Sequence, residues 1–168
     1  SFVFPKNIKI VPKWCFYGCG KLKEIILPEG LTGIAHSAFK YCNSLEEIHI
    51  PSTVTGIGTN AFEHTSLKEV ILPEGLKTIK EDTFYDCDDL EYIYIPDSVE
   101  RIELKAFCSC RKLKSVTLPK NLKTINYWAF YATGLEELVI PEGTTTIGKE
   151  AFRYCNNLTK VTLPKSIK

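Results

Sequence analysis

The chain has 168 residues, of which 44% are hydrophobic and 24% charged, and its 21 Lys and Arg against 20 Asp and Glu give a formal net charge of +1. This balance predicts a soluble folded protein and excludes a strong electrostatic attraction to nucleic acid or anionic lipid. Apolar runs of only a few residues exclude membrane insertion within this segment. The chain has no signal peptide, starts in mid-repeat and lacks Met, so we expect a fragment of a longer chain.

Prolines recur at an almost fixed spacing of 22 or 23 residues along the whole chain. The equivalent positions are Pro5, Pro28, Pro51, Pro73, Pro96, Pro119, Pro141 and Pro164. A fixed period of this length predicts a protein of stacked repeats. We therefore expect one domain over residues 1–168, made of about seven repeats that start near residues 5, 28, 51, 73, 96, 119 and 141, with a partial repeat at 164–168.

A short strand is expected before each of these prolines. Residues 22–27 contain the apolar residues Leu22, Ile25 and Leu27. The end of this segment alternates apolar and variable positions, as expected of a strand with one buried face. The same pattern starts again at Leu45, Leu67, Leu90, Leu113, Leu135 and Leu158. Proline then ends the strand because it has no N–H to donate to a neighbour. A Gly, Ser, Thr or Asn two residues after the proline favours a turn.

Two further segments complete each repeat. An apolar pair such as Leu31 and Ile34 is expected to line a second short strand or extended segment. An Ala-Phe pair such as Ala38 and Phe39 follows, and we predict a helical or 3-10 turn there that tucks the ring inward. One repeat buries too few apolar side chains to offset its backbone entropy, so the repeats must stack, with strands side by side in a parallel sheet over a continuous core.

The repeated frame resembles a known family. Leu45, Ile48 and Ile50 fit the first half of the leucine-rich repeat, L-x-x-L-x-L. The second half departs from it, because Pro and then Gly, Ser or Thr replace the Asn position, followed by I-x-x-x-A-F-x-x-C at 34–42 and 147–155. The chain thereby resembles the BspA-like, or Treponema pallidum-type, leucine-rich repeat proteins. This resemblance implies an α/β solenoid, a curved array with a parallel sheet on its concave face and short strands and helical or 3-10 turns behind it.

The resemblance also implies a class of function. Such repeats belong to surface-exposed or secreted proteins of bacteria and some protists that adhere to host proteins or to other cells. We therefore expect a non-enzymatic protein-binding module at the cell surface or secreted, without a cofactor, whose partner is a protein such as a host-matrix or cell-surface protein and not nucleic acid. The alternative is a structural spacer or a targeting repeat attached to another functional domain.

Cysteine recurs at one position of the frame, which Thr65 and Thr133 take in the two shorter repeats. Its occupants are Cys19, Cys42, Cys87, Cys110 and Cys155. Stacking would bring Cys19 near Cys42, and Cys87 near Cys110, within the reach of a disulfide. The exchange with Thr instead favours small, buried, reduced thiols. The lone C-x-C motif has no His near it in sequence, and no motif for a metal ligand set, a catalytic nucleophile or a phosphate loop is present.

Function is expected on the outward face of the first strands, where residues fall into two columns. The candidate binding residues are Ile26, Glu47, His49, Glu69, Ile71, Tyr92, Tyr94, Ser115, Thr117, Glu137 and Val139. Tyr92 and Tyr94 are the expected anchors, since tyrosine is amphipathic and is common in binding hot spots. The alternative is that these are simply strand-forming residues that pack sideways against their neighbours. The acidic column of Glu24, Glu47, Glu69 and Glu137 would then be a solvated face, whose charge is offset by Lys23, Lys68 and Lys114.

Overall fold

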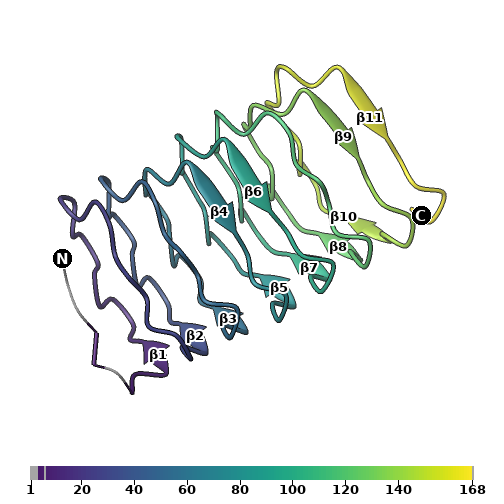
Figure 1. Cartoon of the computed structure of the whole chain (residues 1–168). Coiled ribbons are helices and arrows are strands. Elements are labelled where there is room, and N and C mark those ends of the chain that lie inside the picture. Colours follow the sequence, from purple (N-terminus) through teal and green to yellow (C-terminus); the bar gives the residue numbers. More distant parts are fainter. Residues whose placement is uncertain (1–3, 6, 168) are drawn as a thin grey trace.

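The chain winds into a solenoid of stacked turns (Figure 1). The structure is a computed structural model that describes residues 4–5 and 7–167. Within these residues the strands are β1 (Ile10–Val11), β2 (Gly33–Ile34), β3 (Gly56–Ile57), β4 (Glu69–Ile71), β5 (Thr78–Ile79), β6 (Tyr92–Tyr94), β7 (Arg101–Ile102), β8 (Thr124–Ile125), β9 (Glu137–Val139), β10 (Thr146–Ile147) and β11 (Lys160–Thr162).

Two walls of the solenoid carry these strands, and all pairing between repeats is parallel. The long-strand wall consists of β4 paired with β6, β9 paired with β11, and an isolated bridge between Ile26 and His49. The short-strand wall consists of a sheet in the order β1-β2-β3 and another in the order β10-β8-β7-β5. The predicted parallel stacking and the second short strand are therefore confirmed, although the ladder is divided into separate pieces.

The core lies between the walls and is built from the repeated apolar frame. Its most regular part is a column of phenylalanine rings, one from each turn, stacked nearly parallel with centroids 5.1 to 5.7 Å apart. The rings are those of Phe16, Phe39, Phe62, Phe84, Phe107, Phe130 and Phe152. Phe39 and Ala38 are fully buried, so the expected inward direction of the ring is correct.

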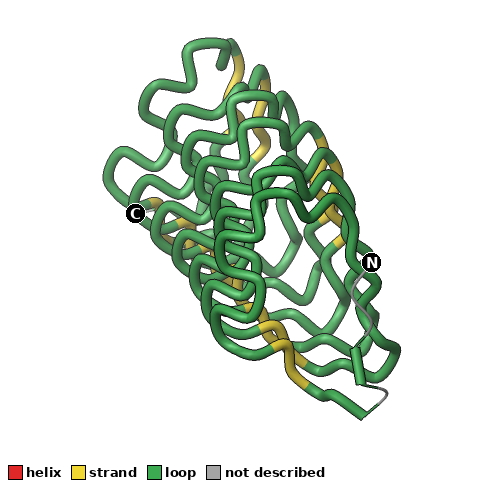
Figure 2. Tube along the Cα trace, turned by 90° about the vertical axis from the view of Figure 1, so that its left-hand side faces the viewer, coloured by secondary structure: helices red, strands yellow, loops and turns green. Residues whose placement is uncertain are grey.

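The third wall, here called the turn wall, consists of residues 35–42 and their equivalents in the other repeats. The prediction of a helical or 3-10 turn in this wall is wrong. Residues 4–5 and 7–167 contain no helix (Figure 2). Alternate amides do donate three residues back, as from Lys40 to Ser37 at 3.3 Å, but those between donate to the next repeat, as from Phe39 to Ala61 at 2.9 Å. Ser37 and Tyr41 have φ of 52° and 62°. Such left-handed residues interrupt the coil and direct the backbone toward its neighbours.

The frame cysteines close the turn wall over the core. All seven cysteines are free, and four donate from Sγ to a phenylalanine carbonyl of the preceding repeat at 3.1 to 3.2 Å. The four are Cys42, Cys87, Cys110 and Cys155. Burial raises the pKa of the Cys42 and Cys87 thiols to about 12, which keeps them protonated as donors. Thr65 and Thr133 donate instead to the phenylalanine carbonyl of their own repeat.

Candidate functional site

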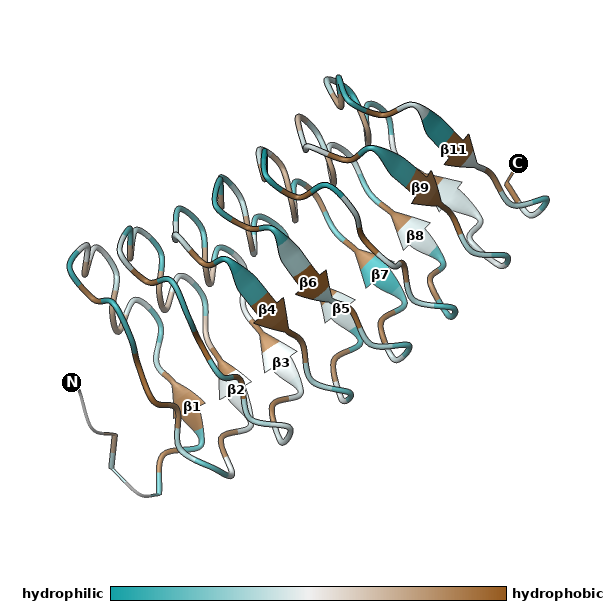
Figure 3. Cartoon of the chain, turned by 45° about the horizontal axis from the view of Figure 1, so that its top comes forward, coloured by the Kyte–Doolittle hydropathy of each residue, from teal (hydrophilic) through white to brown (hydrophobic). Residues whose placement is uncertain are grey.

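The candidate binding residues are all exposed, and they belong to the long-strand wall. Figure 3 shows this wall as the row that carries β4, β6, β9 and β11. Strands β4, β6 and β9 each alternate exposed, buried, exposed, because successive side chains of a strand point to opposite faces. The exposed residues are Ile26, Glu47, His49, Glu69, Ile71, Tyr92, Tyr94, Ser115, Thr117, Glu137 and Val139. The strand register brings Glu69 opposite Tyr92 and Ile71 opposite Tyr94.

One column of this wall exposes aliphatic side chains to an unusual degree. Ile26 is 78% exposed, Ile71 66% and Val139 64%. Sideways packing between neighbouring strands therefore covers only a minor part of these residues. Strand-forming propensity accounts for their β-branched type but not for so much apolar surface in contact with water.

The two tyrosines differ in how firmly they are held. The Tyr94 phenol donates to Glu74 Oε1 at 2.7 Å, and this bond to a carboxylate raises the pKa of Tyr94. Tyr92, on the neighbouring column, is 49% exposed and lies opposite Glu69 in the ladder. Together they present a fixed ring and a freer one from a single strand.

The wall is hollowed beside the tyrosines. An open hollow of about 430 Å³ lies over β4 and the two turns before it. Its outward side chains are the carboxylates Glu24, Glu47 and Glu69 on one column and Ile26, His49 and Ile71 on the other. A second hollow of about 310 Å³ lies beside Thr117, Glu137 and Val139. Most of the predicted residues thus line two recesses, one on each side of β6, while Tyr92, Tyr94 and Ser115 line neither.

The acidic column of the long-strand wall is not neutralised as expected. Among the described residues, the side chains of Glu24, Glu47, Glu69 and Glu137 make no hydrogen bond or ion pair. Lys68 and Lys114, which the sequence suggested as their counter-charges, pair with Glu46 at 2.6 Å and Glu136 at 3.8 Å, one position nearer the edge of the wall. That part of the prediction is wrong, because each of these lysines pairs with a carboxylate of a neighbouring repeat that lies outside the acidic column.

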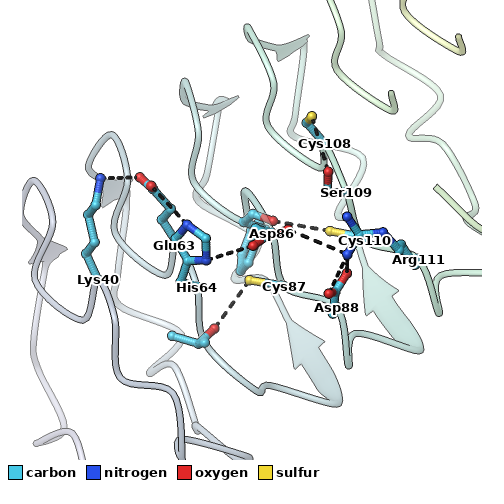
Figure 4. Close-up of polar contacts among 12 residues, drawn as sticks. Lys40, Glu63, His64, Asp86, Cys87, Asp88, Cys108, Ser109, Cys110 and Arg111 are labelled. Carbon is cyan, nitrogen blue, oxygen red and sulfur yellow. Dashed lines mark hydrogen bonds and ion pairs between the residues drawn. The ribbon is translucent and has the colours of Figure 1, made fainter. Parts of the chain in front are cut away.

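Sequence reasoning missed a polar network on the turn wall (Figure 4). Glu63 is buried and pairs with Lys40 at 2.7 Å, while His64 Nδ1 lies 2.8 Å from Asp86 Oδ2. Arg111 extends the network by donating to Asp88 at 2.6 Å.

The spacing of opposite charges was the available signal for this network, since Lys40 and Glu63, and His64 and Asp86, stand one repeat apart. Its side chains bind one another across repeats, so the network stabilises the stack and leaves few groups open for a ligand.

Other kinds of site find no support in the described part of the chain. No group of three His, Cys, Asp or Glu side chains in it is placed to hold a metal ion. Over the same residues, no helix long and apolar enough to cross a membrane is found.

The stacked turns, the L-x-x-I-x-L strands and the buried phenylalanine column define a leucine-rich repeat solenoid. The chain belongs to the BspA-type leucine-rich repeat family. The model of this family, described as BspA type Leucine rich repeat region, matches the chain in six copies over residues 1–103 and 77–168. The resemblance inferred from the frame is therefore confirmed. No curated protein sequence matches the chain.

Solved structures of bacterial proteins are similar to this chain. A leucine-rich repeat protein from Bacteroides ovatus is 28% identical over 94% of this chain and 53% of its own, with a TM-score of 0.79. A leucine-rich repeat protein of T. pallidum is 30% identical over 96% of this chain and 68% of its own, with a TM-score of 0.74. A leucine-rich cell surface protein from Faecalibacterium prausnitzii is 28% identical over 94% of this chain and 37% of its own, with a TM-score of 0.64.

The chain spans about half the length of the B. ovatus relative and a smaller share of the F. prausnitzii one. It is a leucine-rich repeat domain akin to bacterial cell-surface leucine-rich repeat proteins.

Proposed function

We propose that this chain is a non-enzymatic module that binds a protein through its long-strand wall, as the ligand-binding repeat region of a cell-surface or secreted adhesin. One observation carries the proposal: five large apolar or aromatic side chains stand exposed on this one wall. They are Ile26, Ile71, Tyr92, Tyr94 and Val139. The F. prausnitzii relative, described as a cell surface protein, supports the location.

The backbone beneath these residues favours binding. Each strand of the wall is paired with one parallel neighbour, as β6 is with β4, so little backbone entropy is lost when a partner docks. Tyrosine adds contact area with few rotatable bonds. A host-matrix or cell-surface protein that buries Tyr92 and Tyr94 would gain from both effects, and such binding needs no cofactor.

The test is capture of matrix and cell-surface proteins on the immobilised chain. The double variant Tyr92→Ala/Tyr94→Ala should weaken the captured partner by at least about tenfold, as expected for a central aromatic pair. Tyr127→Ala/Tyr154→Ala is the matched control, because these tyrosines are 45% and 52% exposed on the turn wall. Circular dichroism establishes that both variants keep the fold. Equal loss in both variants, or capture of nothing by the parent chain, would favour the spacer alternative.

A further inference from the structure

We propose that the partner presents an extended segment in which lysine or arginine alternates with aliphatic residues, and that this segment lies in the hollow beside β4. The inference rests on the proposed function and specifies the chemistry of the partner. Carboxylates on one side and aliphatic side chains on the other line the same hollow. The occupant must match both sides.

The apolar side of the hollow is the first requirement. Among the described residues Ile26 is the most exposed large hydrophobic residue, and Ile71 is 66% exposed two turns further on. His49 lies between them, opposite Ile26 in the parallel bridge. Aliphatic groups of a partner would remove this surface from water, which is favourable in proportion to the area covered.

The acidic side of the hollow is the second requirement. The bridge between Ile26 and His49 sets Glu24 beside Glu47, and Glu69 follows on the next turn. Strands lie ~4.8 Å apart, so like charges at this spacing repel one another.

Two carboxylates one position nearer the edge pair with a lysine of the neighbouring repeat, Glu46 with Lys68 and Glu136 with Lys114. The three carboxylates of the hollow are exposed and have no such partner among the described residues, so they are available to pair with basic groups of the occupant.

The arrangement of the two columns gives the shape of the occupant. Both columns run across the strands, and they are separated by two residues of strand, or roughly 6.6 Å. Side chains of an extended segment alternate between opposite sides. A segment that runs along the solenoid therefore directs its basic residues to the carboxylates and its aliphatic residues to Ile26 and Ile71. The contacts are between side chains, because β4 already pairs with β6.

The experiment uses a fluorescein-labelled peptide in which lysine alternates with valine, titrated against the chain by fluorescence polarisation. Glu24→Lys/Glu47→Lys/Glu69→Lys should weaken binding at least about tenfold, because attraction becomes repulsion at three positions. Added salt should weaken binding to the parent chain, as it screens exposed charges. Glu29→Lys/Glu81→Lys/Glu142→Lys is the control, with the same charge change on exposed glutamates outside the hollow. We expect it to bind within about twofold of the parent chain, since its charges lie beyond short range of the hollow.

Two companion peptides separate the two requirements. Replacing lysine by glutamate should abolish binding, and replacing valine by serine should weaken it several-fold. If both triple variants lost peptide binding equally, the binding would be due to the overall charge of the protein and the inference would be overturned. Equal binding of the valine and serine peptides would also overturn it.

Failure of the basic-segment proposal and failure of the proposed protein-binding function give different results. A captured protein that is lost in Tyr92→Ala/Tyr94→Ala but retained in Glu24→Lys/Glu47→Lys/Glu69→Lys would leave the binding role intact and overturn the basic segment. Absence of both protein capture and peptide binding would overturn both proposals.

Discussion

Asp82 carries a buried oxygen without a partner, the single such side-chain atom in the described residues. The Asp82 Oδ2 atom accepts from Asn60 Nδ2 at 3.4 Å, and Asn60 also donates to Glu63. Burial raises the pKa of Asp82, and the nearby Glu63 adds to the effect, while Lys105 opposes it. Asp82 has a φ of 52°. The position therefore also requires a residue that tolerates the left-handed region, as Asp and Asn do. Asp82 is a source of local instability at neutral pH.

Asp82→Asn should raise the free energy of unfolding at pH 7 by about 1 kcal/mol, since it removes a half-buried charge and keeps the backbone preference. The folded-state pKa of Asp82 lies above its ordinary value of 3.8, so the charged carboxylate opposes folding at neutral pH. The gain should be complete above the raised pKa and should vanish as the pH falls through it toward 3.8. Urea denaturation across this range measures the effect.

The neighbouring Asp86→Asn provides the contrast at this scale. Asp86 pairs with His64 at 2.8 Å and approaches Arg111, so neutralising it removes favourable contacts. We expect this variant to be less stable than the parent chain at pH 7. If both variants lost stability alike, the interpretation of Asp82 as strained by burial would be wrong.

At the scale of the element, the turn that follows β3 depends on a close approach at one glycine. A Cβ added at Gly58 would overlap the His36 amide nitrogen and would lie 2.6 Å from the Ala35 carbonyl carbon, both backbone atoms of the preceding repeat. A Cβ at Gly56, on β3, would meet nothing within 4 Å. Two glycines of the same repeat therefore serve different purposes.

Gly58→Ala should lower the free energy of unfolding by about 1–3 kcal/mol, because the two repeats must move apart to admit a methyl group. Gly56→Ala should be neutral or stabilising by up to about 1 kcal/mol, because alanine loses less backbone entropy on folding. Thermal unfolding of the two variants beside the parent chain measures the difference. Identical melting curves for the two variants would show that the repeats do not approach as closely as proposed.

The elements differ in how well the sequence predicts them. The strands and their buried faces follow from the alternation around residues such as Ile25 and Leu27 and from the prolines that end them. The turn wall does not, because residues such as Lys105 and Trp128 are left-handed there although their types favour other regions. The hydrogen bonds that stabilise this conformation go to a neighbouring repeat, which no local pattern reveals.

The candidate site divides in the same way. Its outward columns could be predicted, since alternation decides which side of a strand each residue occupies. The direction of the Lys68 and Lys114 side chains could not, because it depends on which carboxylate of a neighbouring repeat lies within reach.

At the scale of the whole molecule, each turn is stabilised mainly by the turns on either side. The phenylalanine stack runs without a break from Phe16 to Phe152, and the frame thiols donate across repeats. Such a chain behaves as a one-dimensional array whose stability sums over interfaces between neighbours. Because the interfaces are nearly alike, we expect the central repeats to unfold together.

The buried thiols report directly on this cooperativity. At about pH 8, iodoacetamide should modify the exposed Cys15 and Cys19 but not Cys42, Cys87 or Cys110, because burial raises the pKa of these three thiols and excludes the reagent. Increasing urea should make the three buried thiols reactive over one common transition, as followed by peptide mass spectrometry. Modification of Cys110 at much lower urea than Cys42 would show that the repeats open independently.

The hydrogen bonds between main chains on the turn wall have a consequence for how such a protein changes over generations. These bonds use atoms that every amino acid except proline possesses, and the interior supplies the rest of the cohesion. The outward positions of the long-strand wall are thus released from the task of folding, and one column already holds Ile26, His49, Ile71 and Tyr94. A lineage can rewrite its recognition surface there, residue by residue, while inheriting the same scaffold intact.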